Sequence, residues 1–169
     1  MQDLAEAYPS ARPRRRSASA TRQPRVPAGG RPRVVLLADD DPVVRHVVRL
    51  LLELQGYKVL EAEDGLDAVA QSLAHEGPID ALVTDVMMPG LNGAQVCLRV
   101  RETRPDTPTL FISGYYPEAV FPNQQLPARS AFLSKPFMPE ELNEAMDRLL
   151  GAVAEGPLWT GSAVSSEKA

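Results

Sequence analysis

The stretch RVVLLADDDP, residues 33–42, places a continuous apolar run directly before three aspartates and a proline. An unbroken run from Val34 to Ala38 is typical of a strand that is buried on both faces, as in a parallel sheet. Asp41 followed by Pro42 is typical of a helix N-cap with proline in the first turn. The stretch therefore predicts a buried strand that leads at once into a helix.

Strand and helix patterns keep alternating beyond this stretch as far as residue 150. We expect strands over residues 34–38, 57–62, 79–84, 109–113 and 131–134, and helices over residues 42–55, 65–74, 94–103 and 139–150. This alternation predicts an α/β fold with a parallel sheet, right-handed crossovers and helices on both faces. Prolines at 117, 122 and 127 leave room only for a short or broken fourth helix.

Polar side chains stand where the predicted strands end. Asp39 and Asp40 follow the first strand, Asp85 the third, Ser113 ends the fourth and Lys135 follows the fifth. Ligands of open α/β sheets bind outside the carboxyl ends of the strands, so these groups should converge. Clustered carboxylates repel one another unless a cation or a proton joins them. The sequence therefore predicts a cation site, with Mg²⁺ as the expected ion and Mn²⁺ as an alternative.

The residue types suggest how a metal and a phosphoryl group would be held. Mg²⁺ keeps several waters and needs only one or two carboxylates, which Asp40 and Asp85 can supply. Asp39 can hold a metal-bound water, and Met87 can offer its backbone carbonyl. Asp85 is the natural nucleophile, since a carboxylate can form an aspartyl phosphate. Lys135 can neutralise the charge that develops on the phosphoryl oxygens.

Four blocks carry a resemblance to a known family. The segments VVLLADDDP (34–42), DALVTDVMMPGLNG (80–93), TLFISGY (109–115) and AFLSKPF (131–137) resemble the signature blocks of the response regulator receiver domain of two-component signalling. The resemblance covers about residues 33–152. It implies a flavodoxin-like (βα)5 three-layer sandwich, with a five-stranded parallel sheet in the order 2-1-3-4-5.

The resemblance also implies roles for single residues. Asp85 is similar to the phosphoacceptor and Lys135 to the phosphate-binding lysine. Ser113 resembles the switch hydroxyl and Phe132 the switch aromatic. The family also implies a cis peptide bond before Pro136.

Partners follow from the same resemblance. Asp85 would take a phosphoryl group from a histidine kinase or a histidine phosphotransfer protein, with Mg²⁺ bound near Asp39 and Asp40. The receiver would catalyse only its own phosphorylation and dephosphorylation, and it would signal through a downstream protein target. The blocks around Ser113 and Lys135 look most like receivers at the C-terminal ends of hybrid histidine kinases. We expect a free-standing receiver that acts as a phosphorelay intermediate or a phosphate sink, with a detached remnant of a hybrid kinase as the alternative.

The ends of the chain differ from its centre in composition. Residues 1–33 carry eight arginines against two acids, a net charge of +6, whereas the rest carries ten basic against twenty acidic groups, a net charge of −10. We predict a disordered Arg/Pro-rich arm over residues 1–32, a receiver domain over 33–152 and a flexible tail over 153–169. The arm could bind nucleic acid, with a solvated tail as the alternative.

The bulk composition bounds the location of the protein. No apolar run approaches the roughly 20 residues of a membrane helix, so no membrane insertion is expected. The single cysteine, Cys97, lies in a helical apolar pattern and fits a reducing cytoplasm.

Two alternative functions remain open at this stage. Asp39-x-Asp41 after an apolar strand resembles the nucleophile motif of haloacid-dehalogenase-type phosphohydrolases, in which Asp39 would attack a phosphate ester. The second alternative is a non-phosphorylated adaptor that keeps only the fold. Neither explains why Asp85 and Lys135 stand at matching strand ends.

Overall fold

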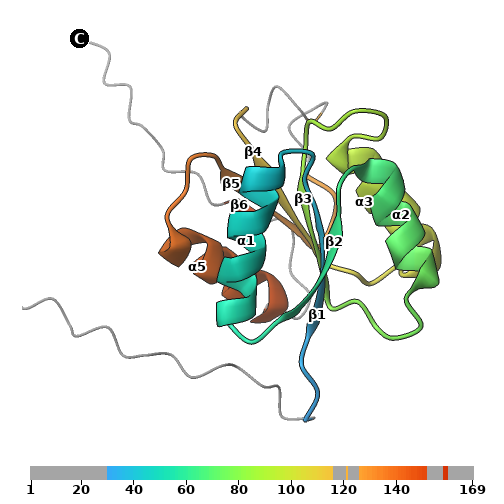
Figure 1. The fold of residues 1–169 in the computed structure, drawn as a ribbon, viewed down its shortest axis with the longest axis horizontal. Helices are drawn as coiled ribbons and strands as arrows, with labels where there is room; N and C mark the ends of the chain where they lie inside the picture. The colour runs from blue at the N-terminus through green and yellow to red at the C-terminus, as the bar shows by residue number, and fades with distance from the viewer. Residues whose placement is uncertain (1–29, 116–120, 122–125, 152–157, 160–169) are drawn as a thin grey trace, which may run out of the picture.

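A computed structural model describes residues 30–115, 121, 126–151 and 158–159, and Figure 1 shows its ribbon. The described strands form one parallel sheet in the order β2-β1-β3-β4-β5-β6. The strands are β1 (Val34–Ala38), β2 (Lys58–Ala62), β3 (Ala81–Asp85), β4 (Thr109–Ser113), β5 (Ser130–Ser134) and β6 (Leu158–Trp159). The helices are α1 (Pro42–Leu54), α2 (Gly65–Ala74), α3 (Gly93–Thr103) and α5 (Pro139–Gly151).

Helices cover both faces of the sheet, which makes three layers. In Figure 1, α1 and α5 lie on one face and α2 and α3 on the other. Because side chains alternate along a strand, β1 sends Val35 and Leu37 to the α1/α5 side and Leu36 and Ala38 to the α2/α3 side. All five side chains of β1 are buried, as expected for the central strand of a parallel sheet.

The predicted fold is confirmed, with small shifts at the ends of elements. The order 2-1-3-4-5 holds for the first five strands. The third strand runs from Ala81 to Asp85 rather than over residues 79–84. Before it, the Asp80 carboxylate accepts hydrogen bonds from the Val34 amide (2.7 Å) and the Arg31 guanidinium (2.8 Å), so this residue fastens the start of β1.

The C-terminal segment differs from the prediction of a wholly flexible tail. Leu158 and Trp159 form β6, which pairs in parallel with Ala131 and Phe132 of β5. An edge strand offers unpaired backbone groups, and a short segment after α5 can occupy them by one more crossover. Two residues are too few to show strand periodicity, so this strand could not be predicted from a local pattern.

The predicted break in the fourth helix falls mainly on residues 116–120 and 122–125, which lie outside the described residues. Within that region Phe121 is described and buried, and its ring packs edge-on against Phe111 with centroids 4.9 Å apart. Among the described helices, none combines the length and the apolar character that crossing a membrane requires.

Candidate functional site

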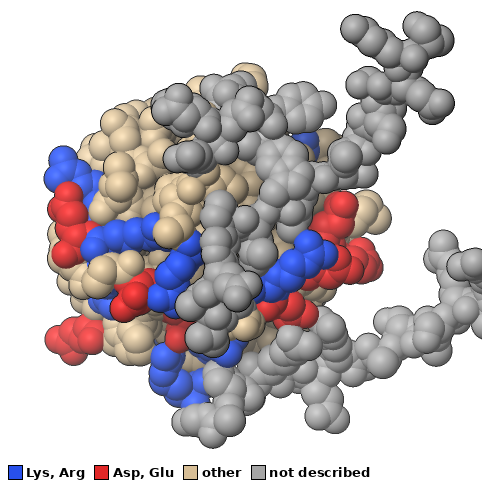
Figure 2. All heavy atoms as spheres, turned by 180° about the vertical axis from the view of Figure 1, so that it is seen from behind, with Lys and Arg blue, Asp and Glu red and all other residues tan. Residues whose placement is uncertain are grey.

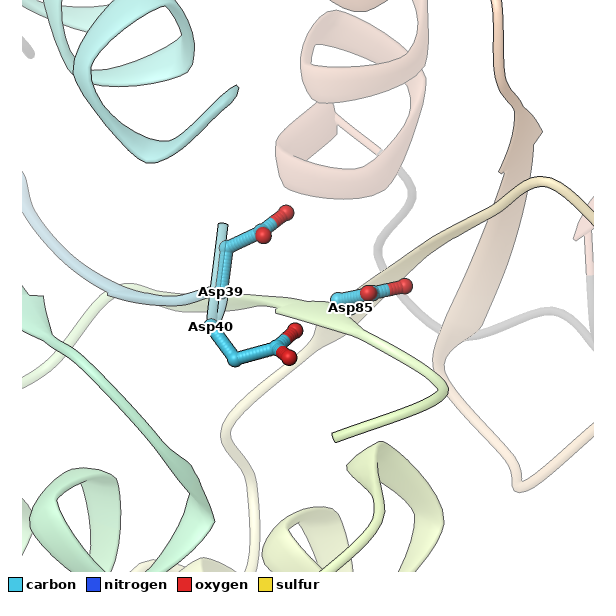
Figure 3. A group of neighbouring side chains, drawn as sticks. All are labelled: Asp39, Asp40 and Asp85. Atoms are coloured by element: carbon cyan, nitrogen blue, oxygen red, sulfur yellow. The ribbon is translucent and has the colours of Figure 1, made fainter. Parts of the chain in front are cut away.

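Three carboxylates converge at the carboxyl end of the sheet. Asp39 and Asp40 directly follow β1, and Asp85 is the last residue of the neighbouring strand β3. Each offers a carboxylate oxygen, and these oxygens lie within 4.8 Å of one another. Figure 3 shows the three side chains gathered at this edge. The expectation that these residues lie together is met.

Asp39 is the buried member of the cluster, with 2% of its surface exposed. One carboxylate oxygen accepts a hydrogen bond from the Asp41 amide at 2.9 Å. The other accepts one from Lys135 Nζ, also at 2.9 Å. Both oxygens of Asp39 therefore already have donors from the protein.

Lys135 joins two of the acids. Its Nζ lies 2.9 Å from Asp39 Oδ2 and 3.5 Å from Asp85 Oδ2. The Lys135 amide donates to the Ser113 carbonyl at 2.7 Å, which ties the end of β5 to the end of β4. The peptide bond from Lys135 to Pro136 is cis, as the sequence resemblance implied.

Asp85 sits in a mixed environment. Burial raises the pKa of its carboxyl group, Lys135 opposes that rise, and the negative charge of Asp39 adds to it. The Val86 amide donates to Asp85 Oδ1 at 2.7 Å. A cation that enters the site would therefore stabilise the charged form of Asp85 beside the second acid.

The donor set fits a small divalent cation. Asp40 is exposed and so faces solvent, whereas Asp85 is half-buried. The arrangement offers carboxylate oxygens only, without histidine or cysteine, which is the chemistry that Mg²⁺ and Mn²⁺ prefer. Two carboxylates at an open edge leave room for the waters that Mg²⁺ retains.

The other predicted residues differ in their surroundings. Ser113 is fully buried at the end of β4, and its Oγ accepts a hydrogen bond from the Tyr115 amide at 3.1 Å. Phe132 is buried in the core on the α2/α3 side. Met87 follows Asp85 by two residues, and 56% of its surface is exposed.

Asp41 has a separate task. Its side chain accepts hydrogen bonds from the Val43 and Val44 amides and caps α1, as the sequence predicted.

Two further residues support the site without having been predicted to do so. Thr84 Oγ1 donates to the Asp85 carbonyl at 2.8 Å, and Arg45 donates to the Asp39 carbonyl at 2.6 Å. Thr84 could have been noticed in the sequence as a polar residue within the apolar strand β3. Arg45 could not, because an arginine on a helix does not indicate a supporting role.

A three-layer α/β domain with carboxylates and a lysine at the carboxyl end of its sheet is suited to hold a cation and a phosphoryl group, and comparison with known proteins identifies the family. The family model of the response regulator receiver domain matches residues 35–147. The chain therefore belongs to the response regulator receiver domain family, whose members act in two-component signalling.

The chain is similar to both short and long members of the family. It is 34% identical over 116 residues to the response regulator receiver protein CpdR of Brucella abortus (strain 2308). The matched region covers 69% of this chain and 95% of that protein. It is also 34% identical to the sensor kinase CckA of the same strain, but spans only 12% of that kinase. The crystal structure of the receiver domain from hybrid histidine kinase CckA superposes with a TM-score of 0.58 at 35% identity, covering 69% of this chain and 98% of that one.

Proposed function

We propose that the protein takes a phosphoryl group from a phosphohistidine donor onto Asp85 and passes the signal on through protein–protein contacts. The observation that carries this proposal is the position of Lys135 between Asp39 and Asp85, with Nζ 2.9 Å and 3.5 Å from their oxygens. A lysine there can hold phosphoryl oxygens, and Asp85 is the less buried of the two acids.

In this proposal each residue has a distinct part. A carboxylate oxygen of Asp85 attacks phosphorus, the P–N bond to the donor histidine breaks, and its electron pair stays with the imidazole. Lys135 then pairs with a phosphoryl oxygen. Ser113, at the end of β4, then moves toward the phosphoryl group and donates its hydroxyl proton to another oxygen. The ring of Phe132 turns inward in response.

The metal would be held by Asp40, Asp85 and the backbone carbonyl of Met87, with Asp39 acting through a bound water. When bound, Mg²⁺ supplies positive charge to the equatorial phosphoryl oxygens. Asp39 suits an indirect role because both of its oxygens already accept hydrogen bonds within the protein. Asp40 suits a direct one because it is exposed.

We propose a histidine kinase or a histidine phosphotransfer protein as the donor and another protein as the target. The similarity to CpdR, a response regulator receiver protein, supports this choice of partners. The free and buried Cys97 supports a cytoplasmic setting. Most of the predicted Arg-rich arm, residues 1–29, lies outside the described residues, whereas Arg31 near its end pairs with Asp80. On the face in Figure 2, basic and acidic side chains lie next to one another.

The competing functions gain no support. A haloacid-dehalogenase-type mechanism needs Asp39 as an accessible nucleophile, yet this residue is 2% exposed and bonded at both oxygens. An adaptor without phosphorylation has no need for a lysine that bridges two acids.

Phosphoramidate tests the proposal directly, because it carries the same P–N bond as phosphohistidine. Intact-mass measurement should show one added phosphoryl group with Mg²⁺ and none with a chelator. The Asp85→Asn variant should gain none under either condition. Equal phosphorylation of this variant and the wild type would reject Asp85 as the acceptor.

A further inference from the structure

The peptide group between Asp39 and Asp40 sets the spacing of two of the three acids. A peptide group is planar, so the direction of its carbonyl fixes the orientation of the whole unit. This unit lies just beyond β1, which ends at Ala38. The Asp39 amide, one peptide earlier, makes a long hydrogen bond of 3.4 Å to the Ala62 carbonyl.

Arg45 holds the carbonyl of that peptide group. Its guanidinium donates a hydrogen bond of 2.6 Å to the Asp39 carbonyl oxygen. A hydrogen bond from a charged donor is shorter and roughly twice as strong as a neutral one. Asp40 is exposed, so its carboxylate depends on the backbone beneath it for its position.

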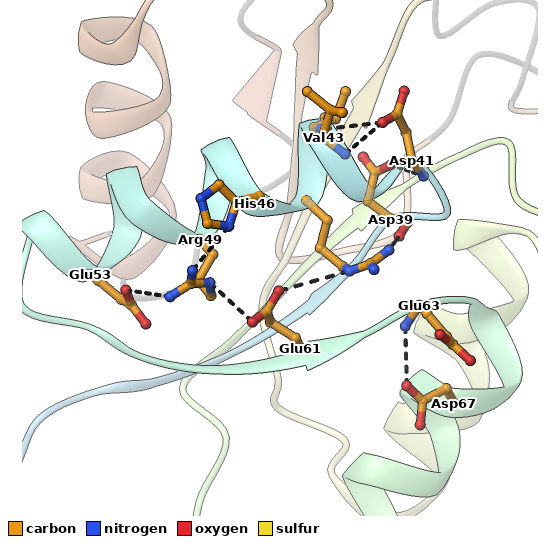
Figure 4. A network of polar contacts seen from close by, with 11 residues as sticks. Asp39, Asp41, Val43, His46, Arg49, Glu53, Glu61, Glu63 and Asp67 are labelled. Atoms are coloured by element: carbon orange, nitrogen blue, oxygen red, sulfur yellow. Dashed lines mark hydrogen bonds and ion pairs between the residues drawn. The ribbon is translucent and has the colours of Figure 1, made fainter.

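The side chain of Arg45 is itself held in place. Arg45 lies one turn into α1, where its amide donates to the Asp41 carbonyl, and only 17% of its side chain is exposed. Its Nε lies 3.8 Å from Glu61 on β2. Glu61 is fixed from the other side by Arg49, whose Nε lies 3.0 Å from it (Figure 4). The network thus spans β2, α1 and the end of β1.

We infer that Arg45 is a positioning residue for the metal site: by fixing the Asp39–Asp40 peptide group, it sets where the Asp40 carboxylate stands. The inference rests on the proposed function only in that Mg²⁺ is the ion. The described contacts of Arg45 go to the Asp39 carbonyl and to Glu61 rather than to the carboxylates of Asp39, Asp40 or Asp85, so its effect on the metal site passes through the backbone. Residues that orient metal ligands typically change metal affinity by about 10- to 100-fold when they are removed.

The neighbouring Arg49 offers a matched control. It stands on the same helix and contacts the same Glu61, but its hydrogen bonds go to Glu53 and His46 rather than to the acidic cluster. Truncating either arginine disturbs the contact with Glu61, whereas only Arg45 truncation frees the Asp39 carbonyl. The two variants therefore separate a general loss of helix contacts from a loss of metal-site geometry.

The test is the Mg²⁺ dissociation constant of the full-length, unphosphorylated protein, measured by isothermal titration calorimetry. Arg45→Ala should weaken Mg²⁺ binding by about tenfold, while Arg49→Ala stays within about twofold of the wild type. Arg45→Lys, which keeps a charged donor without the planar fork, should recover part of the loss. Saturating Mg²⁺ should restore the maximal rate of phosphorylation by phosphoramidate in Arg45→Ala.

Other results would overturn the inference. These are equal Mg²⁺ affinities for Arg45→Ala and the wild type, equal losses in both arginine variants, and no Mg²⁺ binding by the wild type. Urea denaturation of each variant shows whether it is folded, and Arg45→Lys carries the comparison if the alanine variant unfolds. Because the calorimetry involves no phosphoryl transfer, a failure of Asp85 phosphorylation leaves this comparison intact.

Discussion

Among single residues, the three acids differ in burial and in bonding, and these differences support the separate tasks proposed for them. Asp39 is buried and bonded at both oxygens, Asp40 is exposed, and Asp85 is half-buried beside Lys135. Residue types and strand ends were enough to predict this cluster from the sequence. Arg45 could not be predicted, because an arginine on a helix surface usually remains solvated.

The pKa of Asp85 leads to a prediction about stability. Burial raises this pKa, so the native state binds the proton more tightly than the unfolded chain does. That stabilisation is complete at pH values below the ordinary carboxyl pKa and is lost as the pH rises through the raised pKa. Asp85→Asn, which cannot ionise, should therefore be more stable than the wild type at neutral pH, by about 1 kcal/mol.

Urea denaturation at neutral and mildly acidic pH measures this difference, which should shrink in acid. The matched control is Asp106→Asn, at a carboxyl group whose side chain is 87% exposed, so removing the charge there relieves no burial and should bring no gain in stability. A lower stability of Asp85→Asn at neutral pH would contradict the account.

Two exposed residues near the site lead to a prediction about signal lifetime. Met87 and Tyr115 follow Asp85 and Ser113 by two residues, and 56% and 61% of their surfaces are exposed. Neither is an acid or an amide that could orient an attacking water. We predict slow to moderate decay of the phosphoaspartate. Met87→Asn and Tyr115→Glu should each accelerate it by about tenfold, and no acceleration in either variant would reject this explanation.

At the scale of elements, the connection from β1 to α1 positions the acids and starts the helix within four residues. Asp41 caps α1, and Pro42 occupies its first turn, as the cap chemistry predicted. Helix caps and apolar runs placed most element ends to within two residues. β6 was missed because a two-residue strand depends on the edge of β5 rather than on any local pattern.

Asp41 can be separated experimentally from its acidic neighbours. Asp41→Ala should lower the free energy of unfolding by about 1 kcal/mol, because the Val43 and Val44 amides lose their acceptor. Mg²⁺ affinity should not change, since Asp41 lies outside the metal cluster. Asp41→Asn, which keeps a capping oxygen, should restore most of the stability. A large loss of Mg²⁺ affinity in Asp41→Ala would show that this acid is also a ligand.

At the scale of the whole molecule, the strand order brings together groups that are far apart in the sequence. β1 and β3 are neighbours in the sheet, and β5 lies beyond β4, so Lys135 reaches Asp39 across 96 positions of sequence. Strict alternation of strands and helices predicted parallel pairing. The order itself came from the family resemblance, because periodicity alone does not specify which strands are neighbours.

Because the cluster exists only in the folded chain, Mg²⁺ should stabilise the whole molecule. At a concentration about one hundred times the dissociation constant, the gain in unfolding free energy should be about 2.7 kcal/mol. Thermal denaturation with and without Mg²⁺ measures it. Asp40→Asn should lose most of this gain and Asp41→Asn should keep it. A gain of the same size in both variants would place the ion elsewhere.

Phosphorylation of Asp85 is the step on which the proposed function depends, and mass spectrometry that maps the phosphorylated residue decides it. The wild-type protein is treated with phosphoramidate and Mg²⁺, reduced with borohydride to mark the acyl phosphate, digested and sequenced. The mark should fall on Asp85 alone and should be absent from Asp85→Asn. A mark on Asp39, or multiple turnover of an aryl phosphate, would contradict it.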